Sequence, residues 1–447
     1  SGTDERGTET VTMTSRTIPA PAAQVADLAA ELTDLLGPAG VSTQPRALER
    51  VSVDGARLSP ILTAALPLGH AELVAFPRDA AQIGAVVAAA VRHGVPVTPR
   101  GKGTGNYGQG IPMRGGLVLD TTRAKAIVEI GDGVLTAEAG ALMLTLETAA
   151  LQHGQELWMY PSTVQSTLGG FLSGGSGGTG SIEHGVNHLG FVTALDVVHA
   201  TGDPALVHVT GADAQPYVHT YGTAGVITRA TVRLEPAVDW AATYASFPDF
   251  GSAIAAVRPV GALEPTPRLV SADVPTIAAA LPPDPAIPAG RASFRAILHP
   301  ATLARATGLI EAGGGRVEAV RSGLRAVVKM SMLSYNHPIE WLRKRSATPY
   351  FHLEVSGHAL VDRITDVHAV YPGGMLHIEA AHGIPIGMLA APYVDPDQVY
   401  AGFPALAALG VGVHDCHQWY VDHEVAATRA LAARTDPAGL LNPGKLR

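Results

Sequence analysis

The chain has 447 residues, 47% of them apolar, so we expect two or three domains with substantial cores. Its 31 basic and 39 acidic residues give a net charge of −8 without a long basic block, which argues against nucleic acid as a partner. An apolar run of about 18 residues, as a membrane helix needs, is absent from the sequence, and its polar start does not resemble a signal peptide. The single cysteine, Cys416, excludes an internal disulfide and favours a cytoplasmic location.

The first hundred residues predict short strands alternating with helices. Residues 1–20 are polar and are expected to form a disordered leader, and an amphipathic helix is predicted over 21–36. A short strand over 71–76 precedes a helix over 79–93, which has apolar residues at helical spacing and an acidic start. A second strand over 95–99 then leads into a loop rich in glycine.

This loop has glycine at positions 101, 103, 105, 108 and 110. Glycine holds no side chain against a ligand, and successive N–H groups in such a loop can bind an anion, so a diphosphate is the expected guest beside Arg100 and Lys102. The glycine spacing also fits G-x-G-x-x-G, but that dinucleotide fingerprint requires a helix directly after the loop. Pro112 disfavours a helix, and we predict a strand over 117–119 that ends at Asp120. An ordinary exposed turn is the alternative for the loop alone.

A second glycine-dense region follows a predicted hairpin over 128–138 and a predicted helix over 141–153. It covers residues 159–185 and contains apolar residues such as Phe171, which a flexible linker would lack. We therefore predict a short helix whose N-terminus faces a ligand. Strands are predicted over 191–200 and 226–236.

The second half of the chain has fewer motifs. Its proline-rich stretch over 261–290 indicates surface loops that join secondary-structure elements. A helix is predicted over 301–312, and strands are predicted over 324–332 and 352–364.

The order and separation of several segments match a known family. These segments are PRGKGTGNYGQG, LVLDTTR, YPSTVQSTLGG, GSGGTGSIEHG, YGTAGVITRATVRLEP and DPAGLLNPGKL. Together they resemble the vanillyl-alcohol oxidase / p-cresol methylhydroxylase (PCMH) superfamily of FAD-linked oxidases. The resemblance implies an α+β fold, with a PCMH-type FAD-binding domain of two α/β subdomains over 21–236. It also implies a substrate domain over 237–400, with an antiparallel sheet covered by helices, and a segment over 401–447 that returns to the FAD domain.

The resemblance also implies which residues contact FAD. They are Arg100, Gly101, Lys102, Gly103, Thr104, Gly105, Asn106, Gly108, Gln109, Pro161, Ser162, Thr163, Ser166, Thr167, Gly169, Gly170, Gly175, Gly177, Gly178, Thr179, Ser181, Gly225, Val226, Ile227, Asn442 and Lys445. Some members link FAD covalently through a histidine or a cysteine, but Thr104 and Tyr160 stand at those two positions. Non-covalent FAD is therefore favoured, although C-terminal residues such as His414 and His423 leave another linkage open.

Flavin chemistry needs a base for the substrate proton besides the cofactor. His377 and Glu379 would share one face of a strand and could act as base and orienter. With His382 they could instead bind a metal, but the family's metal motifs do not match, and no metal is expected. The remaining catalytic candidates are His417 and Tyr420 in the C-terminal segment, and Lys329, with Tyr335 and Arg363 as further groups for an anionic or phenolic substrate.

These observations predict an FAD-dependent oxidoreductase that takes a hydride from a C–H bond next to oxygen or nitrogen in a small molecule such as a hydroxy acid, alcohol or phenol. In the family, a small residue near Gly115 can leave room for molecular oxygen, which favours an oxidase over a dehydrogenase, but an ordinary turn glycine explains it equally well. The alternatives are a lyase- or cyclase-type flavoenzyme of secondary metabolism and a flavin-binding protein without turnover. The sequence indicates neither the substrate nor the oligomeric state.

Overall fold

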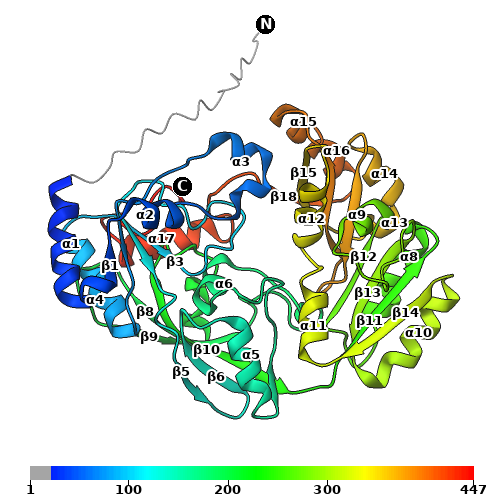
Figure 1. Ribbon diagram of the computed structural model, residues 1–447, viewed down its shortest axis with the longest axis horizontal. Helices are drawn as coiled ribbons and strands as arrows, with labels where there is room; N and C mark the ends of the chain where they lie inside the picture. Colours follow the sequence, from blue (N-terminus) through cyan, green and yellow to red (C-terminus); the bar gives the residue numbers. More distant parts are fainter. Residues whose placement is uncertain (1–21) are drawn as a thin grey trace, which may run out of the picture.

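The computed structural model describes residues 22–447, so the leader predicted over residues 1–20 lies outside the described residues. The chain forms an α+β fold in two parts, which lie on the left and right of Figure 1. The first part contains residues up to Pro236 together with the end of the chain, and it holds two sheets. The second part contains one eight-stranded sheet. The predicted fold class is confirmed.

The first sheet has four strands in the order β1-β2-β4-β3. Its strands are β1 (Val41–Ser42), β2 (Leu73–Ala75), β3 (Val97–Arg100) and β4 (Leu117–Asp120), and its helices are α1 (Ala22–Leu36), α2 (Pro45–Val51), α3 (Pro60–Ala65) and α4 (Ala80–Arg92). Asp79 caps α4, because its carboxylate accepts a hydrogen bond from the Gln82 N–H. The residues described between β3 and β4 form no helix, and β4 pairs in parallel with β3. The predicted strand–loop–strand arrangement is confirmed, which excludes the Rossmann reading of the loop.

The second sheet has six strands in the order β5-β6-β10-β8-β9, with β7 also paired to β10. Its strands are β5 (Ile127–Ile130), β6 (Val134–Glu138), β7 (Gln155–Leu157), β8 (Val192–Val198), β9 (Val207–Thr210) and β10 (Val226–Pro236), and the accompanying helices are α5 (Met143–Leu151), α6 (Leu168–Gly174) and α7 (Ser181–His184). α6 is the short helix predicted inside the second glycine region. The Thr167 hydroxyl caps it by accepting a hydrogen bond from the Gly170 N–H.

The eight-stranded sheet is antiparallel throughout, in the order β14-β11-β13-β12-β16-β17-β15-β18. Its strands are β11 (Ala241–Phe247), β12 (Leu269–Asp273), β13 (Ala292–Leu298), β14 (Arg316–Ser322), β15 (Tyr350–Ser356), β16 (Met375–Glu379), β17 (Ile386–Pro392) and β18 (Gly412–His414). The accompanying helices are α8 (Phe250–Gly261), α9 (Pro275–Ala280), α10 (Leu303–Ala312), α11 (Leu324–Ser331), α12 (His337–Arg345), α13 (Ala359–Asp362), α14 (Ile364–Ala369), α15 (Pro396–Ala401) and α16 (Phe403–Ala408). Because β18 belongs to this sheet, the sheet extends to His414, beyond the boundary expected at residue 400.

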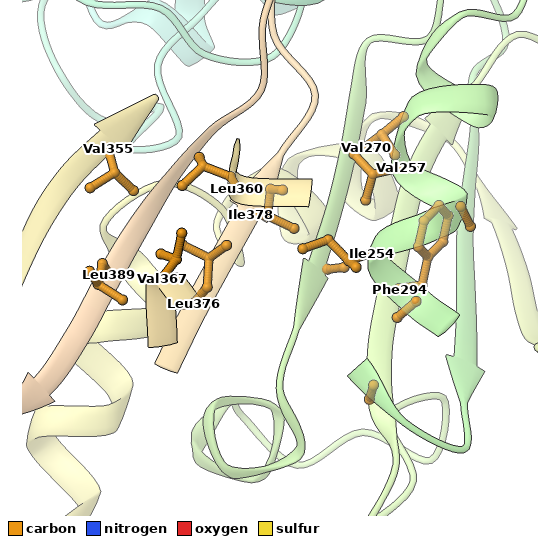
Figure 2. Packing of buried hydrophobic residues seen from close by; sticks show 14 of the residues in the cluster. Ile254, Val257, Val270, Phe294, Val355, Leu360, Val367, Leu376, Ile378 and Leu389 are labelled. Carbon is orange, nitrogen blue, oxygen red and sulfur yellow. The ribbon is translucent and has the colours of Figure 1, made fainter. Parts of the chain in front are cut away.

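Helices cover one face of this sheet and form the largest core (Figure 2). Ile254 and Val257 on α8 pack towards Val270 and Phe294 on the strands beneath. Further along the sheet, Leu360 and Val367 from the short helices and Leu376 and Leu389 from the strands bury their side chains in the same cluster. This core makes the sheet a firm wall for whatever lies on its other side.

Two predictions for this half were wrong in whole or in part. Residues 324–332 were expected to form a strand but form helix α11, which buries Val327 and Met330. These residues are three apart, which is a helical spacing, and the adjacent apolar pair Val327-Val328 concealed it. The strand expected over 352–364 ends at Ser356 instead, because Gly357 has φ 123° and short helices follow.

The end of the chain returns to the first part of the molecule. Helix α17 (Val425–Thr435) packs its Leu431 and Ala432 into the core of the second sheet. Leu441 then pairs in parallel with Val97 of β3, and the Asn442 N–H donates to the Val97 carbonyl over 2.7 Å. None of the helices described between residues 22 and 447 is both long and apolar enough to cross a bilayer.

Candidate cofactor and active site

A cavity of about 650 Å³ lies where the two glycine regions face the eight-stranded sheet. One wall is made by the loop after β3 and a second by residues around α6. The third wall comes from the second part of the molecule, through residues around 335–337, 354–356 and 412–414. Its size suits a large cofactor with a small substrate beside it.

The first glycine loop presents its backbone to the cavity. The main-chain N–H groups of residues 101–106 donate to no protein acceptor within residues 22–447. Gly103 has φ 67°, and a Cβ at Gly101 would overlap the hydroxyl of Thr167. Thr104 joins the two glycine regions, because its hydroxyl lies 2.8 Å from that of Ser166. A run of free N–H groups in a loop without side-chain obstruction is a ready anion site, so the loop fits a diphosphate.

The loop is held in place from beneath. The Lys445 ammonium donates to the carbonyl oxygens of Gln109 (2.8 Å) and Ile111 (2.9 Å), and the Asn442 amide donates to that of Gln109 (3.0 Å). Burial lowers the pKa of Lys445 to about 7, although the nearby carboxylate of Asp54 opposes that effect. Asn442 and Lys445 therefore do not line the cavity but fix the loop that does.

The second glycine region is also held by hydrogen bonds to side chains. The Ser181 hydroxyl accepts from the Gly178 N–H over 2.8 Å, and the Thr179 hydroxyl lies 2.7 Å from that of Ser331 in the substrate domain. A Cβ at Gly178 would overlap the Tyr160 carbonyl, so this glycine is required for close backbone approach. The predicted FAD-contact residues that lie outside the cavity wall are Gly108, Gly178, Thr179, Ser181, Gly225, Asn442 and Lys445. All the others in that set line it.

A network of polar side chains joins the first glycine loop to the second part of the molecule. The Tyr107 hydroxyl donates to the Glu354 carboxylate and accepts a hydrogen bond from the Asn336 amide over 3.1 Å. His414 lies between two carboxylates, with Nδ1 2.7 Å from Glu354 and Nε2 bonded to Asp422. Tyr107, Asn336, Glu354 and His414 all line the cavity.

Contacts among these polar side chains set their protonation states. Burial alone would lower the pKa of His414, but its hydrogen bonds to Asp422 and Glu354 outweigh burial and raise it to about 10. Burial would raise the pKa of Glu354, yet the same contact with His414 holds it below its usual value. Burial and the neighbouring carboxylate raise the pKa of Tyr107 well above 10. At neutral pH the group is thus a neutral phenol, a carboxylate and an imidazolium.

The predicted pair His377 and Glu379 is fully buried in the sheet and does not line the cavity. His377 Nδ1 lies 2.7 Å from Asp273 and Nε2 lies 3.1 Å from Glu379. Glu379 also accepts the Tyr335 N–H over 3.1 Å, and Tyr335 does line the cavity. The structure therefore places this pair outside the cavity wall, where Glu379 holds the backbone of Tyr335.

The other three predicted catalytic residues also lie away from the cavity. Lys329 is an exposed residue of α11, with its ammonium 3.0 Å from Asp284, so its catalytic role stays an untested prediction that this position does not favour. His417 is buried, and its ring nitrogens contact the Ser59 hydroxyl (2.6 Å) and the His352 carbonyl (2.8 Å). Tyr420 stacks beneath the Arg447 guanidinium.

Sequence reasoning missed Tyr107, Asn336 and Glu354. Tyr107 was treated as filler within the glycine loop. Glu354 had a usable signal, because His352, Glu354 and Ser356 alternate along a predicted strand and so share a face. Asn336 precedes a helix and gave no signal of its own.

Comparison with known proteins supports the cofactor. Residues 71–206 match the protein-family model of the FAD binding domain. An uncharacterized FAD-linked oxidoreductase of Mycobacterium tuberculosis is 32% identical over 198 residues, which cover 42% of each chain. The glycolate oxidase subunit GlcD of Bacillus subtilis is 33% identical over 37% of each chain, and a D-lactate dehydrogenase of Archaeoglobus fulgidus is 30% identical over 37% of this chain and 39% of its own.

The same comparisons show how much of each relative the chain matches. The chain spans about two fifths of the length of these curated relatives. A solved alkyldihydroxyacetonephosphate synthase superimposes on 96% of this chain and 86% of its own with a TM-score of 0.75, at 16% identity, which shows a shared fold. The chain thus contains an FAD-binding domain, and FAD is its cofactor. The match to FAD-linked oxidoreductases does not single out the vanillyl-alcohol oxidase branch.

Proposed function

We propose that this protein is an FAD-dependent oxidoreductase that oxidises a small 2-hydroxy acid or a related alcohol. The proposal is carried by one observation, which is that the Tyr107–Glu354 pair faces the same cavity as the two glycine regions. Two relatives are named for glycolate and D-lactate, both small 2-hydroxy acids, which supports this substrate class. The named relatives do not favour the lyase- or cyclase-type alternative.

Bound FAD supplies the hydride acceptor. The chain itself supplies the path for the substrate proton. The substrate hydroxyl donates to the Tyr107 oxygen as the Tyr107 proton moves to the Glu354 carboxylate, so Glu354 ends protonated and Tyr107 stays neutral. Asn336 holds Tyr107 in position by donating to its oxygen. A carboxylate reached through a phenol is a competent acceptor because hydride loss makes the hydroxyl strongly acidic.

His414 acts as a positioning residue in this scheme. Its positive charge between Glu354 and Asp422 keeps Glu354 ionised and ready to accept a proton. When Glu354 becomes protonated its ion pair with His414 is lost, which favours release of that proton.

We further propose that FAD is bound without a covalent link. Thr104 is engaged with Ser166, and Tyr160 is buried with its ring beneath the Arg268 guanidinium. Gly115 gives no basis for molecular oxygen as the electron acceptor, because it lies in a turn beside Glu72 and does not line the cavity. Oxidase and dehydrogenase activity therefore need a direct measurement.

The test starts from the visible spectrum of the purified protein before and after acid precipitation. Flavin bands released into the supernatant would support non-covalent FAD, whereas colour in the pellet would contradict it. Anaerobic addition of a panel of 2-hydroxy acids and alcohols should then bleach the flavin with at least one of them, and admission of air should restore the colour rapidly only in an oxidase. A protein that cannot take up FAD, or that no member of the panel reduces, would contradict the proposed function.

A further inference from the structure

Three histidines from separate segments meet beside the cavity. His188 precedes β8, His219 follows the 3-10 turn Gln215–Tyr217, and His423 precedes α17. Each offers one ring nitrogen, and these nitrogens all lie within 4.8 Å of one another. His219 also lines the cavity. Neither the FAD cradle nor the proposed proton path uses this cluster.

The three imidazole rings pack directly against one another. The centroids of His188 and His423 are 4.2 Å apart, and the rings of His219 and His423 are stacked at 4.8 Å. The Nδ1 atoms of His188 and His219 are buried and have no hydrogen-bond partner among residues 22–447. Buried polar atoms in proteins are nearly always paired, so two orphaned imidazole nitrogens in one cluster point to a missing partner.

The surroundings favour the neutral imidazole that metal ligation requires. Burial, reinforced by His423, lowers the pKa of His219 to about 4 and also lowers that of His188. The backbone is fixed in an unusual shape here, with φ 65° at His219 and φ 45° at Glu424 beside His423. The His219 ring also packs against Gly175, where a side chain would collide with it.

We propose that His188, His219 and His423 bind one divalent transition-metal ion, with Zn²⁺ as the best match. Three imidazoles with a free fourth position is a common zinc arrangement. Zinc bound at about 2.0 Å would bring the three nitrogens to about 3.4 Å from one another, so the rings need to close by about an ångström.

The ion would fasten the C-terminal segment to the FAD-binding domain. His188 and His219 belong to that domain, whereas His423 lies on the chain as it returns from the substrate domain. Asp422 sits between the two sites, with one oxygen 3.8 Å from His219 Nε2 and the other bonded to His414. A bound cation would therefore set the position of Asp422 and, through it, of His414 at the cavity wall.

The test uses tag-free, full-length protein that carries its flavin. The protein is dialysed to equilibrium against Zn²⁺ and its zinc content is measured by inductively coupled plasma mass spectrometry. We expect one zinc per chain, with X-ray absorption at the zinc edge showing three nitrogen ligands at about 2.0 Å. His188→Ala and His423→Ala should each weaken zinc binding more than about tenfold, since even supporting residues around metal sites contribute that much.

Three controls make the result decisive. His153→Ala removes an exposed histidine and should leave one zinc per chain. His184→Ala disrupts the other group of possible ligands, Glu183, His184 and Glu235, and should also leave it. His423→Gln keeps the size of the side chain, and an unchanged flavin-to-protein ratio and circular dichroism spectrum would show that its loss of zinc is not unfolding.

Three outcomes would overturn the site: wild-type protein without stoichiometric zinc, zinc retained in a His188→Ala/His423→Ala double variant, or zinc lost in His184→Ala. Flavin content is measured in the same samples, so failure of the metal site and failure of FAD binding are told apart.

Discussion

The hydroxyl of Tyr107 is the one atom of the proposed proton path that both touches the Glu354 carboxylate and faces the cavity. Tyr107→Phe removes that atom and keeps the ring. We expect the rate constant for flavin reduction to fall by about 10²–10⁴-fold, the usual contribution of a positioned acid–base group. Rapid-mixing absorbance at the flavin band, with the best substrate of the panel, measures it.

Tyr393→Phe is the matched control, since Tyr393 lies outside the cavity wall and should leave the rate unchanged. If Tyr107→Phe reduced its flavin as fast as the wild type, the substrate proton would have to leave by another route.

At Gly101, the addition of a single Cβ atom is expected to decide whether the protein retains flavin. A Cβ there would overlap the Thr167 hydroxyl, which caps α6 and belongs to the second glycine region. Gly101→Ala should therefore displace the two glycine regions from each other and lower the flavin-to-protein ratio of the purified protein severalfold. Gly308→Ala is the control, because Gly308 lies in helix α10 with open space around it, and alanine is the better helix former. Equal flavin content in both variants would contradict the proposed close fit at Gly101.

The two glycine regions could be predicted from the sequence, because only glycine fits where backbone segments approach one another closely. The roles of Tyr107 and Asn336 could not be predicted from the sequence. Tyr107 contacts Glu354 and Asn336, and both lie more than two hundred residues from it along the chain. The catalytic roles predicted for His377 and Glu379 illustrate the same limit. Their spacing on one strand face was correct, but only the fold decides whether that face meets a cavity or a buried layer.

At the scale of elements, a buried polar layer joins strands β12, β13 and β16. Arg295 lies 2.6 Å from Asp273, and Asp273 lies 2.7 Å from His377. Burial would lower the pKa of His377, but the carboxylates of Asp273 and Glu379 together outweigh it and raise the pKa to about 9. The imidazolium is thus a stabilising part of the sheet at neutral pH.

The pH dependence of stability follows from that raised pKa. The folded state holds the proton more tightly than the unfolded chain, so the stabilisation is complete below about pH 6.5 and is lost as the pH rises through about 9. We expect the free energy of unfolding to fall by on the order of 3 kcal/mol over this interval because of His377. Urea titrations at several pH values measure it, and His377→Gln should flatten the curve. An identical pH dependence in that variant would assign the effect to other groups.

Elements in the first part were predictable because each carries a local signal, such as the Asp79 cap of α4 or the turn of the β5–β6 hairpin. Helix α11 was mispredicted because its adjacent pair Val327-Val328 is typical of a strand. Its amphipathic spacing acquires meaning only when the cluster that receives Val327 and Met330 is known.

At the scale of the whole molecule, residues near the end of the chain hold the first glycine loop in place. Lys445→Met keeps the length of the side chain but leaves the Ile111 carbonyl oxygen without its donor and the Gln109 carbonyl oxygen with the Asn442 amide alone. Each buried group left unpaired costs about 1–3 kcal/mol, so we expect the dissociation constant for FAD to rise at least tenfold. Flavin fluorescence on titration of the flavin-free protein measures it. Lys125→Met, an exposed substitution, is the control, and equal affinity in both would show that Lys445 does not hold the loop.

The arrangement of the two parts was predictable only through family resemblance. Composition and periodicity indicate the elements, but nothing local indicates that β18 extends the substrate-domain sheet or that Leu441 pairs with Val97. Such contacts are set by the packing of distant segments, which a single sequence does not display.

The pairing of Leu441 with Val97 has a consequence for biosynthesis. The glycine loop is synthesised well before its supports, because Asn442 and Lys445 follow Gln109 by 333 and 336 residues. Domains generally begin to fold from the N-terminal side as they emerge, so the nascent first part of the molecule has an incompletely supported loop until these two residues emerge. We therefore expect chains that terminate before Asn442 to retain flavin poorly.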